Sequence, residues 1–287
     1  RTGTSLTRNQ VPSGLRIWSA WEPAATVSSD SCGPITDCHD AGGSPNKQMV
    51  TDSLTEGVAH EDVPIRPAAT VIPLRDGRDS IEVLVLRRDN NLAFHGGSWV
   101  FPGGRIDPGD FQAAASDDVA AAARHAAVRE AKEEADLNIA APDLVSLSHW
   151  TTPIGRNRRF STWFYAVHAQ SGQVTIDDGE IRDFEWHPVA EAISGCEAGE
   201  INLAGPTYVS LLDLARHNLV AEALDSVRSQ PDRIFLPRIV RQEDQMFSVY
   251  SEDPAYESGD LSAPGPRHRM QMLTKGYVYT NEVHEGS

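Results

Sequence analysis

Two stretches of this sequence decide its fold. The first reads Phe101-Pro102-Gly103-Gly104-Arg105-Ile106-Asp107-Pro108-Gly109-Asp110, and the second reads Arg129-Glu130-Ala131-Lys132-Glu133-Glu134. The second stretch ends the alanine-rich run Val119–Ala135, which predicts a long helix with Ser116 or Asp117 as its cap. Consecutive glycines allow a sharp turn and a close approach of the backbone to a ligand. We therefore expect a glycine turn ahead of a helix rich in glutamate.

Three glutamates of this helix share one face. Glu130, Glu133 and Glu134 are spaced i, i+3 and i+4, which brings their side chains together on a helix. Like charges so placed destabilise an isolated helix, and a hard divalent cation such as Mg²⁺ would compensate them. A solvated acidic surface is the alternative, and the helix spacing alone favours it. The glycine stretch upstream reverses that preference, because its backbone can approach a ligand and offer a carbonyl oxygen to a metal.

The two stretches together resemble the signature of the Nudix hydrolase family, G-x5-E-x7-R-E-U-x-E-E-x-G-U, in which U is apolar. Gly104 opens the pattern, and the second half is matched by Arg129, Glu130, Ala131, Glu133, Glu134 and Leu137. Three positions depart from it: Asp110 replaces the first Glu, residues 111–128 replace a spacer of seven, and Asp136 replaces the last Gly. Asp tolerates the left-handed conformation at a helix end. The insertion leaves the start of the helix and the role of Asp110 open.

The resemblance implies an α/β fold, the Nudix α/β/α sandwich around a mixed β-sheet, over roughly residues 65–220. It implies that Glu130 and Glu134 are the principal ligands of Mg²⁺ or Mn²⁺, with Glu133 as a further ligand. The carbonyl of Gly104 is another candidate ligand.

The resemblance also suggests roles in proton transfer. An acidic residue shortly before a tryptophan faces the metal ions in many family members, and Glu180 ahead of Trp186 fits that place. Either Glu134 or Glu180 would serve as general base, while an acidic surface turn is the alternative for Glu180. Arg129 is expected to orient a neighbouring glutamate through a charge-assisted hydrogen bond, the alternative being a surface ion pair with Glu133.

A basic cluster between two expected strands is the candidate substrate-binding segment. In an acidic chain these side chains are suited to substrate phosphates, since arginine binds phosphate through its planar fork; an exposed hairpin tip is the alternative. The segment comprises Arg156, Arg158, Arg159 and Phe160. Trp163, Phe164 or Tyr165 could stack on a base, although aromatic residues of a strand more often belong to the core.

Neighbouring segments resemble the branch of the family that contains a peroxisomal coenzyme A diphosphatase. The likeness rests on the insertion and on Arg87-Arg88, His95–Gly104, Trp150–Pro153 and Arg159–Thr162. Ala93 stands where the bacterial coenzyme A motif has an arginine. Coenzyme A or acyl-coenzyme A is the first expected substrate. ADP-ribose, NADH, dinucleotide polyphosphates and oxidised nucleotides are alternatives, as is a non-catalytic module that binds a nucleotide.

The composition excludes several kinds of partner. The chain has 287 residues, of which 40% are hydrophobic, and a formal net charge of −16, which disfavours binding to nucleic acid or an anionic membrane. No apolar run approaches the roughly 20 residues of a membrane span. Three cysteines, Cys32, Cys38 and Cys196, indicate a reduced cytoplasmic protein. We expect a small nucleotide-type substrate, and the oligomeric state stays open.

The chain divides into three parts. Residues 1–62, rich in Ser, Gly, Asp and Pro, are expected to form a disordered extension; residues 1–48 precede the first methionine and are a candidate mis-assigned start. Residues 63–230 alternate strands and helices, which indicates an α/β domain. Residues 231–287 are strand-like, and we expect them to pack on the domain or form an interface. The expected strands are 68–74, 81–87, 98–101, 144–151 and 160–169, and the expected helices are 119–135, 188–194, 206–217 and 221–229.

Overall fold

The computed structural model describes residues 63–90, 97–169, 174–176 and 179–283. The expected N-terminal extension, residues 1–62, and the motif position Ala93 lie outside the described residues. A mixed sheet runs through the centre of the expected domain in the order β3-β2-β1-β6-β5-β8, with β4 beside β1 and β7 beside β2. Its strands are β1 (Ile65–Asp76), β2 (Ile81–Arg88), β3 (Trp99–Val100), β4 (Gly103–Arg105), β5 (Val145–Thr151), β6 (Arg159–His168), β7 (Ile181–Pro188) and β8 (Arg233–Phe235).

The sheet combines parallel and antiparallel pairs. β1 pairs with β6 and β5 with β8 in parallel, while the other neighbours are antiparallel. The seven consecutive buried residues Ala68–Leu74 place β1 in the interior of the sheet, as the β-branched and apolar composition of this run predicted.

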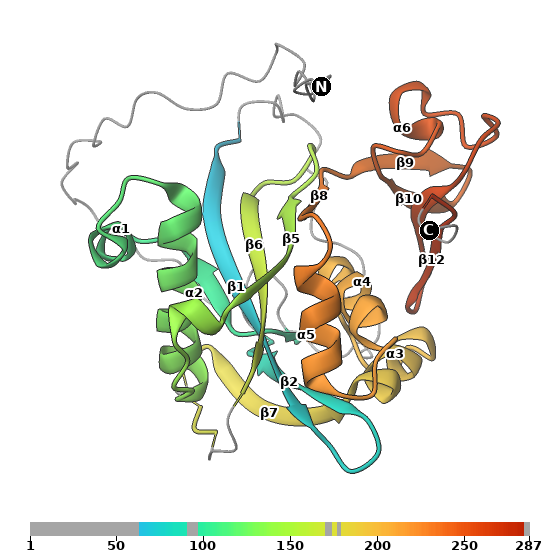
Figure 1. The fold of residues 1–287 in the computed structure, drawn as a ribbon. Coiled ribbons are helices and arrows are strands. Elements are labelled where there is room, and N and C mark those ends of the chain that lie inside the picture. Colours follow the sequence, from blue (N-terminus) through green and yellow to red (C-terminus); the bar gives the residue numbers. More distant parts are fainter. Residues whose placement is uncertain (1–62, 91–96, 170–173, 177–178, 284–287) are drawn as a thin grey trace, which may run out of the picture. The chain divides into compact units, whose positions relative to one another are not determined.

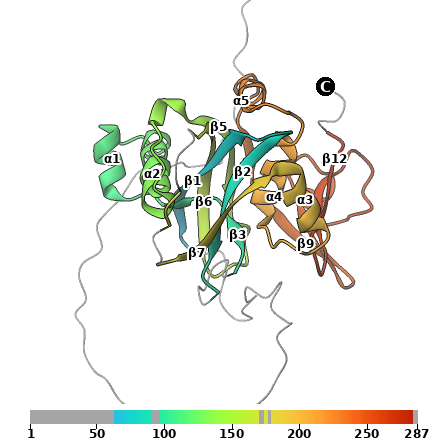
Figure 2. The same cartoon turned by 90° about the horizontal axis from the view of Figure 1, so that it is seen from below.

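Helices cover both faces of the sheet (Figures 1 and 2). On one face, α2 (Val119–Ala135) packs its alanines against Val71, Leu84 and Leu86. On the other face, a second apolar cluster joins the sheet to α3 (Val189–Glu197), α4 (Gly205–Leu214) and α5 (Val220–Arg228). The expected α/β/α sandwich around a mixed sheet is therefore confirmed.

The ends of α2 follow the local sequence. The helix has the expected bounds, but Asp118 caps it: its carboxylate accepts hydrogen bonds from the N–H groups of Ala120 and Ala121 at 3.3 and 3.2 Å. The expected caps Ser116 and Asp117 are wrong, because the left-handed Ala115 ends the preceding helix and the chain reaches the cap position three residues later. Asp136 ends α2 in the left-handed conformation with φ of 53°, as expected for the residue that replaces the family's glycine.

The glycine stretch is a strand and not a turn. Gly103–Arg105 forms β4, which pairs with Ala68–Thr70 of β1. A Cβ atom on Gly103 would lie 2.6 Å from Oγ1 of Thr70, so glycine is required here for close packing of two backbones. After β4 the chain forms the short helix α1 (Pro108–Ala114), which begins with a capping box of Asp107 and Asp110 and runs into the inserted residues 111–128.

The C-terminal residues form a second sheet in the order β12-β11-β10-β9. It contains β9 (Arg238–Gln242), β10 (Gln245–Val249), β11 (His268–Met272) and β12 (Tyr277–Asn281), with the short helix α6 (Ala255–Ser258) between β10 and β11. Tyr250 and Met270 join the apolar cluster that packs on one face of the first sheet, which also contains Phe235 of β8. The ring of Trp150 stacks on that of Phe235 with centroids 3.9 Å apart. No helix among the described residues combines the length and the apolarity that a membrane crossing needs.

Candidate metal and active centre

Glu134 lies buried under the glycine strand. It is 9% exposed, and its Oε2 accepts a hydrogen bond from the N–H of Gly103 at 3.0 Å. Burial raises the pKa of Glu134 to about 8; the hydrogen bond from Gly103 opposes this rise and the nearby charge of Glu130 adds to it. The fold thus buries the carboxylate of Glu134 without an adjacent positive charge that fully compensates its own. Burial of an ionised carboxylate costs free energy unless a cation or a proton neutralises the charge.

Glu130 occupies the space that a side chain at position 104 would need. A Cβ atom on Gly104 would lie 2.2 Å from Oε1 of Glu130. Burial raises the pKa of Glu130, and its hydrogen bond with Arg129 opposes the rise. Glu133 is different, because its side chain is 58% exposed and its Oε2 accepts a hydrogen bond from Nη1 of Arg129 at 3.0 Å.

The residues present fit a hard divalent cation. Mg²⁺ is usually held by one or two carboxylates together with water and substrate phosphate oxygens, and Glu130 and Glu134 provide two carboxylates whose charges burial leaves undercompensated. No group of three or more His, Cys, Asp and Glu side chains poised to hold a metal ion occurs in the part of the chain that the structure describes. This arrangement suits an ion that shares its coordination with substrate.

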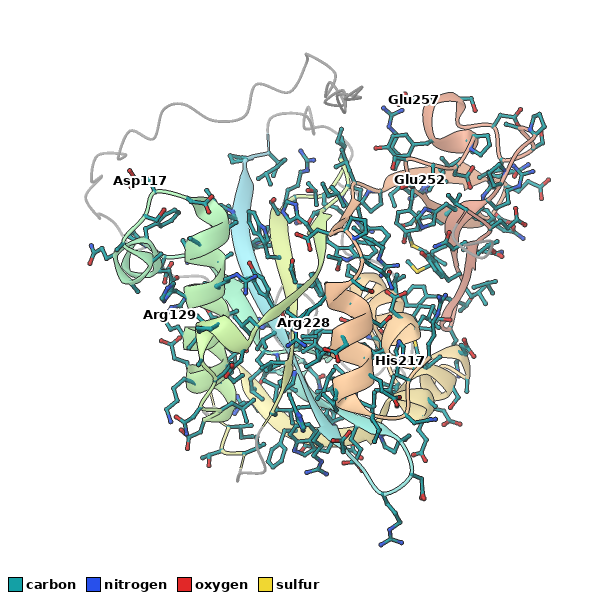
Figure 3. All side chains as sticks on the ribbon, in the orientation of Figure 1. Asp117, Arg129, His217, Arg228, Glu252 and Glu257 are labelled. Atoms are coloured by element: carbon teal, nitrogen blue, oxygen red, sulfur yellow. The ribbon has the colours of Figure 1, made fainter. Side chains whose placement is uncertain are left out.

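Arg129 links α2 to Asp110 of α1 and to the end of β4. Its Nε and Nη2 donate to Oδ1 and Oδ2 of Asp110, each at 3.1 Å, and its Nη1 donates to Glu130 at 2.8 Å (Arg129 is labelled in Figure 3). A second Nη2 contact at 3.0 Å reaches the carbonyl of Arg105 at the end of β4. Asp110 is 3% exposed. Arg129 therefore contacts Glu130, as the resemblance implied, and Asp110 is its main partner despite the insertion.

Glu180, immediately before β7, lies within electrostatic reach of Glu134. Its Oε2 accepts a hydrogen bond from Nη2 of Arg88 at 2.8 Å, and its charge raises the pKa of Glu134, whereas the charge of Arg88 lowers it. Sequence reasoning proposed Glu180 but assigned no role to Arg88. The alternation along β2 indicates the side on which Arg88 lies: Arg88 follows Leu84 and Leu86 at every second position, and the side chains of both leucines face α2.

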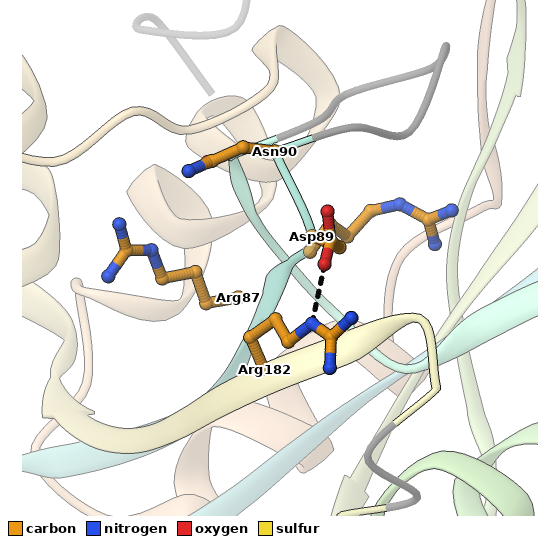
Figure 4. Close-up of a pocket in the computed structure, with 5 residues that line it drawn as sticks. Arg87, Asp89, Asn90 and Arg182 are labelled. Carbon is orange, nitrogen blue, oxygen red and sulfur yellow. Dashed lines mark hydrogen bonds and ion pairs between the residues drawn. The ribbon is translucent and has the colours of Figure 1, made fainter.

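Arg87 faces the other side of the sheet. It lines a recess of about 290 Å³ at the ends of β2 and β7, which an ion pair between Asp89 and Arg182 borders (Figure 4). By alternation along the strand, Arg87 follows Val83 and Val85, which pack toward α3 and α4. Arg88 lines the same recess, and its Nη2 donates to Glu180.

The candidate substrate-binding segment lies at the tip of the β5–β6 hairpin. Arg159 is 7% exposed and its Nε donates to the carbonyl of Thr152 at 3.1 Å, so its guanidinium holds the hairpin. Phe160 donates its backbone N–H to Oγ1 of Thr152. Arg158 is exposed, and Arg156 lies within electrostatic reach of Tyr277 on β12. Arg156 thus lies near the C-terminal sheet.

Comparisons with known proteins agree with this geometry. Residues 64–204 match the family model of the NUDIX domain. A NUDIX hydrolase from Alicyclobacillus acidocaldarius superposes with a TM-score of 0.54 at 25% identity, over 59% of this chain and all of the other. A MutT protein from Methanosarcina mazei Go1 gives a TM-score of 0.42 at 15% identity, over 54% of this chain and 96% of the other.

The NUDIX domain of NrtR from Shewanella oneidensis, solved as a complex with ADP ribose, gives a TM-score of 0.41 at 17% identity, over 56% of this chain and 92% of the other. No curated protein sequence matches this chain. The matched domain and the fold define a hydrolase of phosphoric anhydrides. The chain belongs to the Nudix hydrolase family, whose members cleave diphosphate linkages in nucleoside diphosphate derivatives.

Proposed function

We propose that this protein is a Mg²⁺- or Mn²⁺-dependent hydrolase that cleaves the diphosphate linkage of a nucleoside diphosphate joined to another group. The pair Glu130 and Glu134 beside the Gly103–Gly104 strand carries the proposal: Glu134 is buried, the side chain of Glu130 is 13% exposed, and their partial or full burial raises the pKa of both. Residues 63–230 would form the catalytic domain, and residues 231–287 an appendage packed on it.

The residues of the site divide the chemical work. A bound divalent ion would neutralise phosphate oxygens and acidify the attacking water. Glu130 and Glu134 would hold it, with Glu133 and the carbonyl of Gly104 as further candidate ligands. Arg129 would keep Glu130 in place through their 2.8 Å contact.

The proton of the attacking water would pass to Glu134 or to Glu180. Each of these two carboxylates has one feature that suits a general base. Glu134 is buried, and a base near neutral pH benefits from a raised pKa. Glu180 is 59% exposed and is held by Arg88. The variants Glu134→Gln and Glu180→Gln show which of the two carboxylates is the general base. Loss of the base lowers kcat even at saturating metal. Loss of a metal ligand instead raises the metal concentration that gives half of the maximal rate.

Coenzyme A or acyl-coenzyme A is the first proposed substrate. The support is the insertion inside the signature together with the segments Arg87-Arg88 and Trp150–Pro153. ADP-ribose, NADH and other dinucleotides are the second choice, since they contain the same type of linkage. Arg156 and Arg158, on the hairpin tip, would contact a distal part of such a substrate.

The decisive experiment is hydrolysis of a substrate panel by the wild type and by Glu134→Gln. The panel contains coenzyme A, ADP-ribose, NADH, diadenosine polyphosphates and 8-oxo-dGTP, each with Mg²⁺ or Mn²⁺. We expect turnover of at least one compound and a kcat lower by about 10²–10⁴-fold in the variant. Glu222→Gln, on the exposed side of α5, is the matched control and should keep full activity.

Absence of turnover with every compound and both metals, in protein shown to be folded by its thermal transition, would contradict the proposal. Nucleotide binding without hydrolysis in that protein would support the alternative of a non-catalytic module.

A further inference from the structure

A second recess lies on the face of the sheet opposite to α2. It has a volume of about 170 Å³ and is formed by the carboxyl-terminal ends of α4 and α5, the start of β8 and Leu147 of β5. Leu147 belongs to the apolar cluster that α3, α4 and α5 cover, whereas α2, which carries Glu130 and Glu134, packs on the other face. This α4–α5 recess is therefore separate from the candidate metal centre.

The lining of the α4–α5 recess is basic although the chain is acidic. Arg216, His217 and Arg233 line it, and one of the other described lining residues, Asp213, carries a carboxylate; the formal net charge of the chain is −16. Arg233 forms an ion pair with Asp213. Arg216 is exposed, and its side chain makes no ion pair within the described ranges. The recess thus offers two guanidinium groups for one carboxylate.

The two arginines lie near each other although they come from different elements. Burial raises the pKa of Tyr279 on β12 to about 12, and the charges of Arg233 and Arg216 both oppose this rise. Exposed charges are largely screened beyond about 10 Å, so both guanidinium groups lie close to the hydroxyl of Tyr279. One small anion could therefore contact both of them.

The charge of Arg233 is not fully compensated by its partner. Its guanidinium carbon lies 5.3 Å from the centre of the Phe235 ring, and its side chain is 22% exposed. Burial lowers the pKa of Arg233, and a buried cation costs free energy unless anions neutralise it. Compensation of the helix dipole accounts for cations that follow α4, such as Arg216 and His217, but Arg233 belongs to a strand.

We propose that the α4–α5 recess binds the phosphate group of a small phosphorylated ligand. Arg233 and Arg216 bind the phosphate oxygens, because the planar fork of a guanidinium matches the geometry of phosphate, and Gln230 is a further donor. Leu147 and Val227 contact the carbon atoms next to the phosphate.

The size of the recess limits the ligand. Pockets for drug-sized molecules measure about 300–1,000 Å³, whereas this recess measures about 170 Å³. It therefore takes free phosphate or a small phosphate monoester, and it is too small for a whole nucleoside diphosphate derivative. The site is distinct from the substrate site, and the proposal does not depend on the proposed function.

Phosphate binding by the metal-free protein tests the site. Titration calorimetry with inorganic phosphate or glycerol 3-phosphate in the presence of a chelator prevents binding through Mg²⁺. Arg233→Met and Arg216→Ala should each weaken binding by at least about 10-fold, the equivalent of one hydrogen bond to a charged group. Asp213→Asn should instead strengthen binding, because Asp213 competes with the phosphate for Arg233. A merely structural role of the ion pair would not change phosphate affinity in opposite directions.

Two arginines outside the recess provide the controls. Arg228, labelled in Figure 3, is an exposed arginine of α5 that pairs with Asp225 and does not line the recess. Arg87 lines the other basic recess, beside β7. Arg228→Ala and Arg87→Ala should both leave phosphate affinity unchanged. Arg216 is exposed, so Arg216→Ala keeps the test valid if Arg233→Met does not fold.

The two probes distinguish the sources of the phosphate group. Tighter binding of glycerol 3-phosphate than of inorganic phosphate would identify the ligand as a phosphate monoester that contacts the apolar wall, and equal binding would identify it as free phosphate. No binding of either probe by the wild type at millimolar concentration, equal losses in Arg228→Ala and Arg216→Ala, or weaker binding in Asp213→Asn would each overturn the proposal.

Discussion

At the scale of single residues, the close approach of Glu130 to Gly104 predicts the effect of a substitution at position 104. Its substitution by alanine would place a methyl group 2.2 Å from Oε1 of Glu130, far inside any real contact, so the carboxylate must move. We expect Gly104→Ala to lower kcat/KM by at least 10-fold, since misplacement of a catalytic group by about 1 Å can cost about 100-fold.

Gly109→Ala is the natural control for this change. A Cβ atom at position 109 has no neighbour within 4 Å, and alanine is favoured over glycine in a helix such as α1. This variant should keep its activity and unfold at the same or a slightly higher temperature. Equal loss of activity in both variants would show that the position of Glu130 is not the cause.

Glu134 predicts how the stability of the metal-free protein depends on pH. Burial raises the pKa of Glu134 to about 8 in the folded state, above its ordinary value of 4.5. Between these values the folded protein keeps a proton that the unfolded chain has released, so its free energy of unfolding falls as the pH rises through this window. The slope from this group approaches about 1.4 kcal/mol per pH unit.

Urea unfolding from pH 5 to pH 8 in the presence of a chelator measures this slope. Glu134→Gln has nothing to titrate at this position and should show a flatter dependence than the wild type. Saturating Mg²⁺ should also flatten the wild-type curve, because a bound cation favours the ionised carboxylate. Parallel curves for wild type and variant would mean that Glu134 does not titrate in this range.

At the scale of elements, one ion pair holds α1 against α2. The carboxylate of Asp110 receives two hydrogen bonds from Arg129 of α2 and one from its own capping box, the N–H of Asp107 at 2.8 Å. Asp110→Ala should therefore destabilise the protein by about 1.5–3 kcal/mol, the usual loss for a hydrogen bond to a charged group. It should also lower activity, because Arg129 then loses one of the contacts that fix it beside Glu130.

Denaturant unfolding and steady-state kinetics on the same samples check both effects. Asp110→Glu, which restores the residue of the family signature, should retain more stability and activity than Asp110→Ala. Asp117, an exposed carboxylate in the segment between α1 and α2, provides the control variant Asp117→Ala, which should change neither. If Asp110→Ala lowers stability but leaves kcat/KM intact, the pair holds the fold without positioning Glu130.

The elements differ in how far local sequence predicts them. The bounds of α2 are visible in its run of alanines, because intrinsic helix propensity accumulates over many residues. β4 was expected as a turn and α1 was not expected at all. Gly103-Gly104 has no strand propensity, and it is extended because β1 offers hydrogen-bond partners in register. β7 was likewise missed, since its exposed residues Arg182–Glu185 hide the apolar alternation that marks a strand.

At the scale of the whole molecule, two tyrosines test how the C-terminal sheet is joined to the catalytic domain. The hydroxyl of Tyr277 donates to the carbonyl of Leu203 at 2.9 Å, whereas the buried hydroxyl of Tyr250 has no hydrogen-bond partner within the described ranges. Tyr277→Phe should cost about 1 kcal/mol, because it leaves a carbonyl unpaired. Tyr250→Phe should be neutral or stabilising, because it removes a buried polar group that makes no bond.

Thermal unfolding of the two variants gives the comparison directly. One cooperative transition is expected in each case, since Tyr250 and Met270 of the C-terminal part share an apolar cluster with the first sheet. Two separate transitions, or a larger loss in Tyr250→Phe than in Tyr277→Phe, would contradict this view of the joint.

The sequence by itself determined the helix of glutamates, the α/β class and the family, because these depend on residues close together in the chain: helix periodicity, glycine spacing and carboxylate spacing act locally. Only the tertiary structure decided which carboxylates lose contact with water. Glu134 is buried and Glu130 partly buried because β4 lies against them, while Glu133, on the same helix, is exposed and contacts Arg129 at the surface. The pairing of Arg88 with Glu180 and the register of β1 with β4 and β6 join residues far apart in the chain. Sheet register sets those contacts, and register depends on packing across the whole domain.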